Sequence, residues 1–261
     1  MTDVNGVNIS AEMPYLAQYI TTLETWLEAE LQYRGADNFI FGVSGGVDSA
    51  VIAFLLKRRF KDRAIGVMMP SHSHPNDLKD AILVMEEAGL PYHVVDLTKS
   101  VDSLMEAVGD QYNHTGDVAK DRVIFGNNSA RLRMTTLYTI AQTRNGVVVG
   151  TDNAVEWYTG YFTKFGDGGV DIAPLIHLDK DEIFELARIL GVPQSIIDKK
   201  PSAGLWEAQT DEDEMGVTYH ALNQHLRGEA VTEAERERIA YWHERSHHKR
   251  AMPRMPEKPQ R

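Results

Sequence analysis

Short apolar runs rich in β-forming residues alternate with helix-like segments through the first 150 residues of the chain. The strand-like runs cover residues 38–43, 64–69, 92–96 and 147–150, and the helix-like segments cover residues 10–34, 50–60, 78–88, 101–108 and 130–143. Short buried-type strands that alternate with helices are typical of a parallel sheet with helices on both faces. The sequence therefore predicts an α/β fold, a doubly wound, mostly parallel sheet of the Rossmann-like type.

The remainder of the chain is predicted to be helical. Beyond Asp179 the pattern indicates helices, one of which starts with a capping box formed by Thr232 and Glu235. No internal repeat and no sharp change of composition divides the 261 residues. We therefore expect a single domain, residues 1–261, with a helical C-terminal part.

Charge and cysteine usage exclude several classes of function. The net charge of −11 disfavours binding of nucleic acid or an anionic membrane over the whole surface. The chain has no cysteine, which excludes disulfides, thiolate metal sites and cysteine nucleophiles. The longest apolar run, residues 50–56, falls short of the roughly 20 residues that span a bilayer, and the start of the chain lacks the apolar core of a secretory signal. We expect a soluble, cytoplasmic protein.

The string Ser44-Gly-Gly-Val-Asp-Ser49 follows the first predicted strand and leads into a helix. The two glycines allow backbone amides to approach a ligand, and the start of the helix directs its free amides to the same place. This arrangement predicts a phosphate-binding loop. It is not a Walker A loop, because Asp48 stands where a phosphate binder would place a lysine. A carboxylate beside phosphates needs an intervening cation, so Asp48 predicts Mg²⁺.

Two other interpretations of this loop stay open. Residues 42–46 also fit the G-x-S-x-G nucleophile elbow, which would make Ser44 the nucleophile of a hydrolase with a downstream histidine. The sequence has no His-Gly-Gly segment of the kind that forms an oxyanion hole in such enzymes. The plainest interpretation is a glycine-rich turn that only starts a helix. A nucleotide-binding regulatory module without turnover is a further possibility.

The loop resembles that of the N-type ATP pyrophosphatases, and other segments narrow the resemblance to the family of ammonia-dependent NAD⁺ synthetases. These segments, which include Phe-Thr-Lys-Phe-Gly-Asp-Gly-Gly at 162–169, lie in family-like order at residues 128–134, 148–156, 160–169, 171–175, 201–205 and 248–250. The resemblance implies the fold of the adenine nucleotide alpha hydrolases. The absence of cysteine fits it, because it removes both a persulfide carrier and a cysteine-dependent glutaminase. One departure is Ser202-Ala-Gly204, where members often have Thr-Ala-Asp.

The resemblance implies ATP-dependent amidation of deamido-NAD⁺ by ammonia. The nicotinate carboxylate is adenylated and ammonia then displaces AMP, so that NAD⁺, AMP and pyrophosphate are the products. ATP is a co-substrate, Mg²⁺ the cofactor, and a homodimer the expected assembly, with neither nucleic acid nor a membrane as partner. The ATP-binding residues implied are Gly42, Val43, Ser44, Gly45, Gly46, Val47, Asp48, Ser49, Thr151, Lys180 and Ser202.

The same resemblance implies the remaining site residues. Asp48 and Glu156 are the Mg²⁺ ligands, and Asp48 and Asp167 the catalytic residues, Asp167 binding ammonium and helping to remove its proton. The expected deamido-NAD⁺ contacts are Arg131, Lys164, Asp171, His248 and Lys249.

Structural interpretations of several of these residues stay open beside the functional ones. Without the resemblance, Lys180 would be interpreted as a surface lysine, and Asp167 as a residue that braces a glycine turn. Arg133 would pair across a helix turn, and the basic tail would be disordered. For His72 and His74 we favour exposed loop positions over a metal site.

Overall fold

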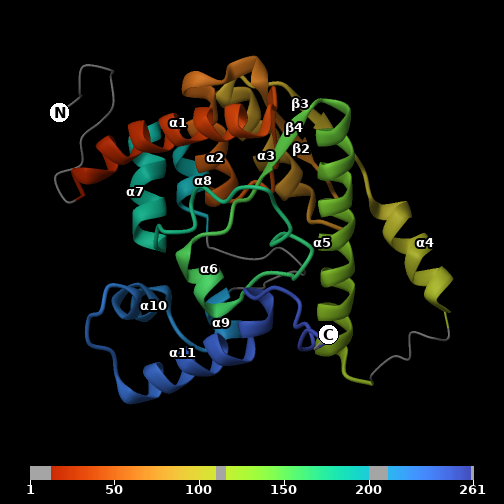
Figure 1. Ribbon diagram of the computed structural model, residues 1–261, viewed down its shortest axis with the longest axis vertical. Helices are drawn as coiled ribbons and strands as arrows, with labels where there is room; N and C mark the ends of the chain where they lie inside the picture. The colour runs from red at the N-terminus through yellow and green to blue at the C-terminus, as the bar shows by residue number, and fades with distance from the viewer. Residues whose placement is uncertain (1–12, 110–115, 200–210, 260–261) are drawn as a thin grey trace.

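A computed structural model describes residues 13–109, 116–199 and 211–259, and within them four parallel strands form one sheet (Figure 1). The strands are β1 (Asn38–Gly42), β2 (Ala64–Met68), β3 (Tyr92–Val94) and β4 (Gly146–Val149), in the order β3-β2-β1-β4. Phe39 of β1 pairs with Ala64 on one side and with Val147 on the other. Because the chain winds outward from β1 in both directions, the switch point of the sheet lies between β1 and β4.

Helices cover both faces of the sheet, as the sequence predicts. The first face carries α1 (Tyr15–Arg34), α2 (Val47–Arg59), α3 (Pro75–Ala88), α7 (Lys180–Leu190) and α8 (Gln194–Ile197), with a short 3-10 turn η1 (Lys61–Arg63) after α2. The second face carries α5 (Val118–Thr143), against which α4 (Thr98–Val108) packs. Side chains of β1 alternate between the faces: Phe39 and Phe41 enter the first core and Ile40 enters the second. The predicted α/β fold is thus confirmed.

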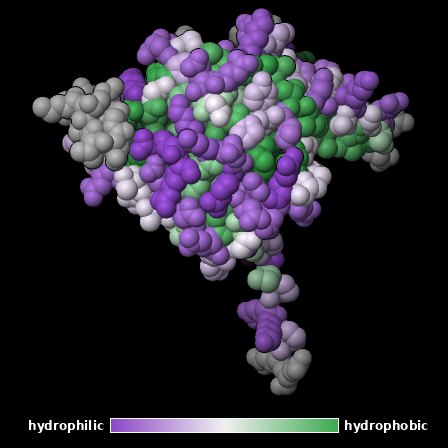
Figure 2. Space-filling view, turned by 90° about the horizontal axis from the view of Figure 1, so that it is seen from above, coloured by the Kyte–Doolittle hydropathy of each residue, from purple (hydrophilic) through white to green (hydrophobic). Residues whose placement is uncertain are grey.

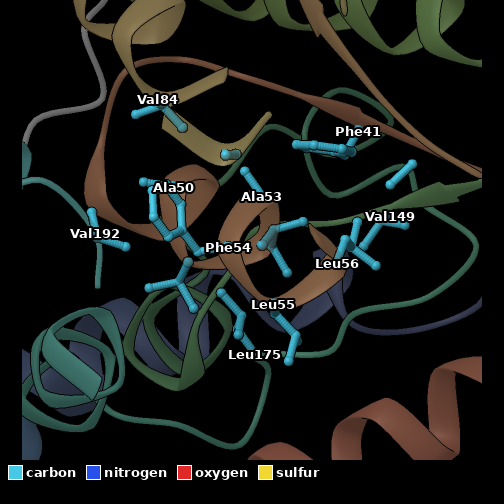
Figure 3. Packing of buried hydrophobic residues seen from close by; sticks show 14 of the residues in the cluster. Phe41, Ala50, Ala53, Phe54, Leu55, Leu56, Val84, Val149, Leu175 and Val192 are labelled. Carbon is cyan, nitrogen blue, oxygen red and sulfur yellow. The ribbon is translucent and has the colours of Figure 1, made fainter. Parts of the chain in front are cut away.

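Helix α2 is the centre of the larger core. Figure 3 shows side chains of β1, α3 and β4 gathered around it, with Phe41, Val84 and Val149 among them. The ten residues 47–56 contain only buried or nearly buried apolar side chains apart from Asp48 and Ser49. A helix so enclosed holds its N-terminus, and the loop in front of it, in a fixed place at the end of the sheet.

A third, smaller core lies in the helical C-terminal part. The helices α6 (Ala154–Thr159), α9 (Asp211–Met215), α10 (Tyr219–Leu226) and α11 (Glu233–Arg245), with the 3-10 turn η3 (His247–Lys249), make up this part. Val155 of α6 packs there with Met215, Leu222 and Ile239. The capping box at Thr232 and Glu235 is confirmed as the start of α11. The single domain over residues 1–261 stays a prediction.

The element boundaries differ from the predicted ones where polar residues conceal the pattern. Helix α5 begins at Val118, twelve residues before the predicted start, because the poor helix formers Gly126-Asn-Asn128 interrupt its first half. Helix α2 begins at Val47 instead of residue 50, so half of the Ser-Gly-Gly-Val-Asp-Ser string is helical. Strand β3 covers only residues 92–94 and is exposed, as befits the edge of a sheet. No described helix is both long enough and apolar enough to cross a bilayer.

Candidate active site

The loop between β1 and α2 is folded back on itself around two serines. The Ser44 amide donates to the Ser49 hydroxyl at 3.3 Å, the Gly46 amide donates to the Ser44 hydroxyl at 3.2 Å, and the Ser49 hydroxyl donates to the Gly46 carbonyl at 3.0 Å. Gly45 has φ of +82°, and a Cβ there would lie 2.7 Å from the Asp77 carbonyl oxygen. The loop therefore requires glycine at this position, and it presents the start of α2 to an anion.

The surroundings of Ser44 do not support a nucleophile. Its hydroxyl lies 3.2 Å from the Ser49 hydroxyl and accepts from the Gly46 amide. Within the described residues no histidine bonds to it, so the general base that a serine nucleophile needs is missing there. Nothing supports the serine hydrolase interpretation.

Asp48, Glu156 and Lys180 meet beside this loop although they are far apart in sequence. The Lys180 ammonium lies 2.6 Å from Asp48 Oδ2 and 3.8 Å from Glu156 Oε1, and the Asn153 amide donates to Asp48 Oδ1 at 2.8 Å. The Lys180 side chain is 3% exposed. The interpretation of Lys180 as a surface lysine is therefore wrong, because α7 starts inside the site and not at the surface.

This group is short of positive charge, because one ammonium lies against two carboxylates. Burial, and next the Asp48 carboxylate, raise the pKa of Glu156 to about 8, against the opposing effects of Lys180 and the Asn153 amide. Burial alone would lower the pKa of Lys180, but the Asp48 and Glu156 carboxylates outweigh it and raise that pKa instead. One ammonium thus serves two carboxylates, and an added cation would be stabilised there.

The donor set fits Mg²⁺. Asp48 and Glu156 offer hard carboxylate oxygens, and the Lys180 ammonium between them marks a place where positive charge is already bound. Among the described residues no group of three or more acids or histidines could enclose a metal ion. Such a site suits Mg²⁺, which keeps water and phosphate oxygens among its ligands.

Two residues of the site were missed by the sequence reasoning. Asp152 lies three residues after the end of β4 and is only 8% exposed; burial, and next the charge of Asp167, raise its pKa well above the usual range. Asn153 caps α6 with its side-chain oxygen and holds Asp48 with its side-chain nitrogen. The polar run Thr151-Asp-Asn153 at the end of a buried strand was the available signal, since ligands bind beyond the carboxyl ends of parallel strands.

The turn at 163–168 places Asp167 close enough to Asp152 for its charge to raise the Asp152 pKa. The Thr163 amide donates to Asp167 Oδ1 at 2.8 Å, and the Thr163 hydroxyl donates to Asn127 of α5 at 2.7 Å. A Cβ at Gly168 would lie 2.4 Å from the Phe162 ring. Asp167 therefore does brace a glycine turn through one oxygen, while the residue remains exposed. Its role toward ammonium stays a prediction.

Four of the five predicted substrate residues gather around the segment 160–168. Arg131 Nε donates to the Lys164 carbonyl at 3.3 Å, and Lys164 Nζ donates to the His248 carbonyl at 2.6 Å. Lys249 Nζ donates to the Gly160 carbonyl at 2.7 Å. These cations thus lie together, and their contacts here are with backbone carbonyls.

Asp171 lies apart from the other predicted substrate residues. It stands at the edge of the sheet, where its Oδ2 accepts the Val148 amide at 2.8 Å and its Oδ1 accepts the Tyr138 hydroxyl at 3.3 Å. Arg34 of α1 donates to the Asp171 carbonyl at 3.1 Å. The carboxylate therefore fixes the strand-like segment beside β4, and a substrate contact by Asp171 stays a prediction.

The remaining predicted positions are distributed as follows. Thr151 lies two residues after the end of β4, one residue before Asp152, and Ser202 lies outside the described residues. Arg133 donates to the Met69 carbonyl at 3.0 Å, so its pairing is with the loop after β2 and not across a helix turn. His72 pairs with Asp102 at 2.8 Å, and His74 caps α3.

A phosphate-type loop at the end of β1, with carboxylates at the end of neighbouring β4, defines a nucleotide-binding α/β protein whose site lies at the switch point of the sheet. The comparisons with known proteins agree with this class. The family model described as NAD synthase matches residues 19–253. The chain belongs to this family.

Relatives and solved structures carry two related names. "NH(3)-dependent NAD(+) synthetase" of Mannheimia succiniciproducens is 46% identical over 93% of this chain and 97% of its own, and the protein of that name from Alkaliphilus oremlandii is 45% identical over 88% and 93%. The structure of NMN synthetase from Francisella tularensis is 42% identical, with a TM-score of 0.87 over 92% of this chain and 98% of its own. The NH3-dependent NAD synthetase of Campylobacter jejuni is 26% identical, with a TM-score of 0.75 over 93% and 99%.

Proposed function

We propose that this protein is an ammonia-dependent, AMP-forming amide ligase that converts the nicotinate carboxylate of deamido-NAD⁺ into the amide of NAD⁺. The observation that carries the proposal is the Asp48–Lys180–Glu156 group beside the phosphate loop. The relatives named NH3-dependent NAD⁺ synthetase, which match along nearly their whole length, support the choice of reaction.

The first half-reaction makes the carboxylate reactive. The loop at 43–49 holds the outer phosphates of ATP, and Lys180 adds a positive charge close to them. Asp48 and Glu156 would hold Mg²⁺, which, when bound, neutralises the phosphate charge. The nicotinate oxygen attacks the α-phosphorus and pyrophosphate leaves, so that the acyl-adenylate carries AMP as its leaving group.

The second half-reaction needs neutral ammonia. Ammonium predominates near neutral pH, so a carboxylate must take one of its protons before nitrogen attacks the acyl carbon. We assign this role to Asp167, with buried Asp152 as the neighbouring acid. The attacking nitrogen then loses a second proton as AMP leaves, and the amide remains.

A second candidate substrate is nicotinate mononucleotide, which carries the same carboxylate on half of the dinucleotide. The observation that favours it is the close likeness to the NMN synthetase of Francisella tularensis, with a TM-score of 0.87 against 0.75 for the NAD synthetase of Campylobacter jejuni. The two substrates are distinguished by their kcat/KM values under identical conditions. The larger value identifies the physiological substrate.

The deciding experiment supplies ATP, Mg²⁺, ammonium and each nucleotide in turn, and measures AMP together with the amide product. Asp48→Asn should lose most of the turnover while its circular dichroism stays unchanged, because the variant lacks a metal carboxylate. Glutamine in place of ammonium should support no reaction, since the chain has no cysteine for a glutaminase of that kind. Absence of AMP formation with both nucleotides would overturn the proposal.

We also propose that the protein is a cytoplasmic homodimer. Apolar side chains of α4 and α5 that are more than a third exposed include Leu104, Val108, Val118, Val123 and Ile124. Figure 2 shows apolar surface at the end of the molecule where α4 lies. A second copy would cover these side chains. Sedimentation of the wild type and of Ile124→Asp measures this: the wild type should be dimeric and the variant monomeric.

A further inference from the structure

The C-terminal segment of the described chain covers the end of helix α6. Three donors from it bond to carbonyls at that end. Arg250 bonds to the Trp157 carbonyl at 3.0 Å, the ring nitrogen Nδ1 of His243 to the Tyr158 carbonyl at 2.9 Å, and Lys249 to the Gly160 carbonyl at 2.7 Å. Trp157 and Tyr158 lie in the last turn of α6, where carbonyls lack the usual helical partner, and Gly160 is the cap residue that follows. The Trp157 carbonyl also accepts the Gly160 amide at 3.3 Å.

Helix α6 cannot hold its own shape. It has six residues, and so short a helix is unstable in water without outside contacts. Its N-terminal end is fixed by Asn153, which caps the helix and donates to Asp48. Its C-terminal end is fixed by the donors just described. Glu156, the second carboxylate of the candidate metal site, lies between these two anchors.

The Arg250 guanidinium connects the end of helix α6 with the C-terminal segment that covers it. Besides the Trp157 carbonyl it donates to the Ser246 hydroxyl at 2.8 Å and to the His243 carbonyl at 2.6 Å. The approach is close enough to require a glycine: a Cβ at Gly160, whose φ is +66°, would lie 2.1 Å from the Ser246 Cβ. A bond in the opposite direction also joins the two segments: the Lys164 ammonium donates to the His248 carbonyl at 2.6 Å.

We propose that His243, Ser246, Lys249 and Arg250, here called the C-terminal clasp, position Glu156 and the segment 160–168, with Arg250 as the central positioning residue. The inference rests on the proposed function, in which Glu156 holds Mg²⁺ against ATP. It assigns to the basic tail a role toward the metal half of the site, whereas a direct contact of His248 or Lys249 with the nucleotide would act on the other substrate. Loss of the positioning role should change Mg²⁺-dependent ATP binding, whereas loss of a direct contact should change the KM for the nicotinate nucleotide.

The first measurement needs neither metal nor substrate. In the free protein, amide hydrogen exchange of a peptide covering residues 153–162 should be faster in Arg250→Ala than in the wild type, while exchange across α2 stays unchanged. Arg254→Ala is the matched control, because Arg254 is an exposed residue of the same tail. Unchanged exchange at 153–162 in Arg250→Ala, or an equal increase along the whole chain, would overturn the proposal.

The second measurement follows Mg²⁺-dependent ATP binding. In Arg250→Ala the Mg²⁺ concentration at half-saturation should rise about tenfold, the lower end of the effect of groups that orient metal ligands. Added guanidinium ion should restore part of the loss, and Arg254→Ala should match the wild type. A rise confined to the KM for the nicotinate nucleotide would show a direct substrate contact and would overturn the clasp.

A milder variant covers the case in which Arg250→Ala does not fold. Arg250→Lys keeps the charge but cannot reach two carbonyls and a hydroxyl together, so it should show the same changes to a smaller extent. Wild-type values for this variant in both measurements would overturn the proposal. Failure of the proposed function would appear separately, as a wild type that forms no AMP while its exchange behaviour is unaffected.

Discussion

Lys180 Nζ lies 2.6 Å from Asp48 Oδ2, and this ion pair joins the first turn of α7 to the first turn of α2. Both helices begin at the same end of the sheet, so their positive ends converge there as well. Asp179 fixes the start of α7, because its carboxylate caps the helix and accepts two bonds from Arg227. The position of the ammonium is therefore determined by the fold before any nucleotide binds.

Lys180→Met should destabilise the protein by about 3–5 kcal/mol, the usual cost of leaving a buried charge without its partner. Asp48 and Glu156 would then face each other without a cation. The loss should be larger at pH 8 than at pH 5, because Glu156, whose pKa is about 8, is protonated at the lower pH. Urea unfolding at the two pH values measures this, with exposed Lys79→Met as the control. Equal losses for the two variants would contradict the prediction.

The raised pKa of Glu156 predicts how stability depends on pH. Its pKa is about 8 in the folded protein against an ordinary value of 4.5, so between these values the folded state binds a proton that the unfolded chain releases. The contribution of this group to stability is full below about pH 4.5 and is lost as the pH rises toward 8. Glu156→Gln should remove this part of the slope. Thermal unfolding from pH 5 to 8.5 checks it, and an unchanged slope in the variant would show that another group is responsible.

The same pKa predicts the pH dependence of metal binding. Mg²⁺ needs the ionised carboxylate, so the Mg²⁺ concentration at half-saturation of ATP binding should fall between pH 6.5 and 8.5. Asp48 and Lys180 face Glu156 and remain in place in Glu156→Gln. That variant should bind Mg²⁺ more weakly at every pH and should lose most of the trend. A trend of wild-type size in Glu156→Gln would exclude Glu156 as the titrating ligand.

Gly45→Ala should abolish ATP binding, because φ of +82° and the Asp77 carbonyl at 2.7 Å both exclude a side chain. Gly89→Ala is a matched control: Gly89 has φ of +65°, but nothing lies within 4 Å of its Cβ position. The control should lose only about 1 kcal/mol of stability and should bind ATP normally. Normal ATP binding by Gly45→Ala would mean that the loop can move away from α3.

Asp171→Ala should lower the free energy of unfolding by about 1.5–3 kcal/mol, because its carboxylate bonds to the Val148 amide and the Tyr138 hydroxyl. The KM for the nicotinate nucleotide should change little. Asp167→Asn should show the opposite pattern, with near-normal stability and a raised KM for ammonium. If Asp171→Ala instead had normal stability and a raised KM for the nucleotide, Asp171 would be a substrate-binding residue and not a structural one.

Local patterns were sufficient for the sheet and the phosphate loop. The loop is one contiguous string between a strand and a helix, so turn chemistry and helix-end electrostatics could be inferred from neighbouring residues alone. The capping box at Thr232 and Glu235 was predicted for the same reason. The first half of α5 was not, since the poor helix formers Gly126-Asn-Asn128 interrupt it.

Only the tertiary structure decided how distant polar groups are paired. Lys180 is 132 residues from Asp48, and neither residue carries a periodicity that links it to the other. The polar run that contains Asp152 follows a buried strand, but that Asp152 lies beside the loop after β1 was decided by the pairing of β4 with β1. The basic tail shows the same limit, because a run of cations looks alike whether it meets a substrate anion or the carbonyls of a short helix. Composition and spacing determine which elements form, whereas the packing of those elements determines which charges are buried together.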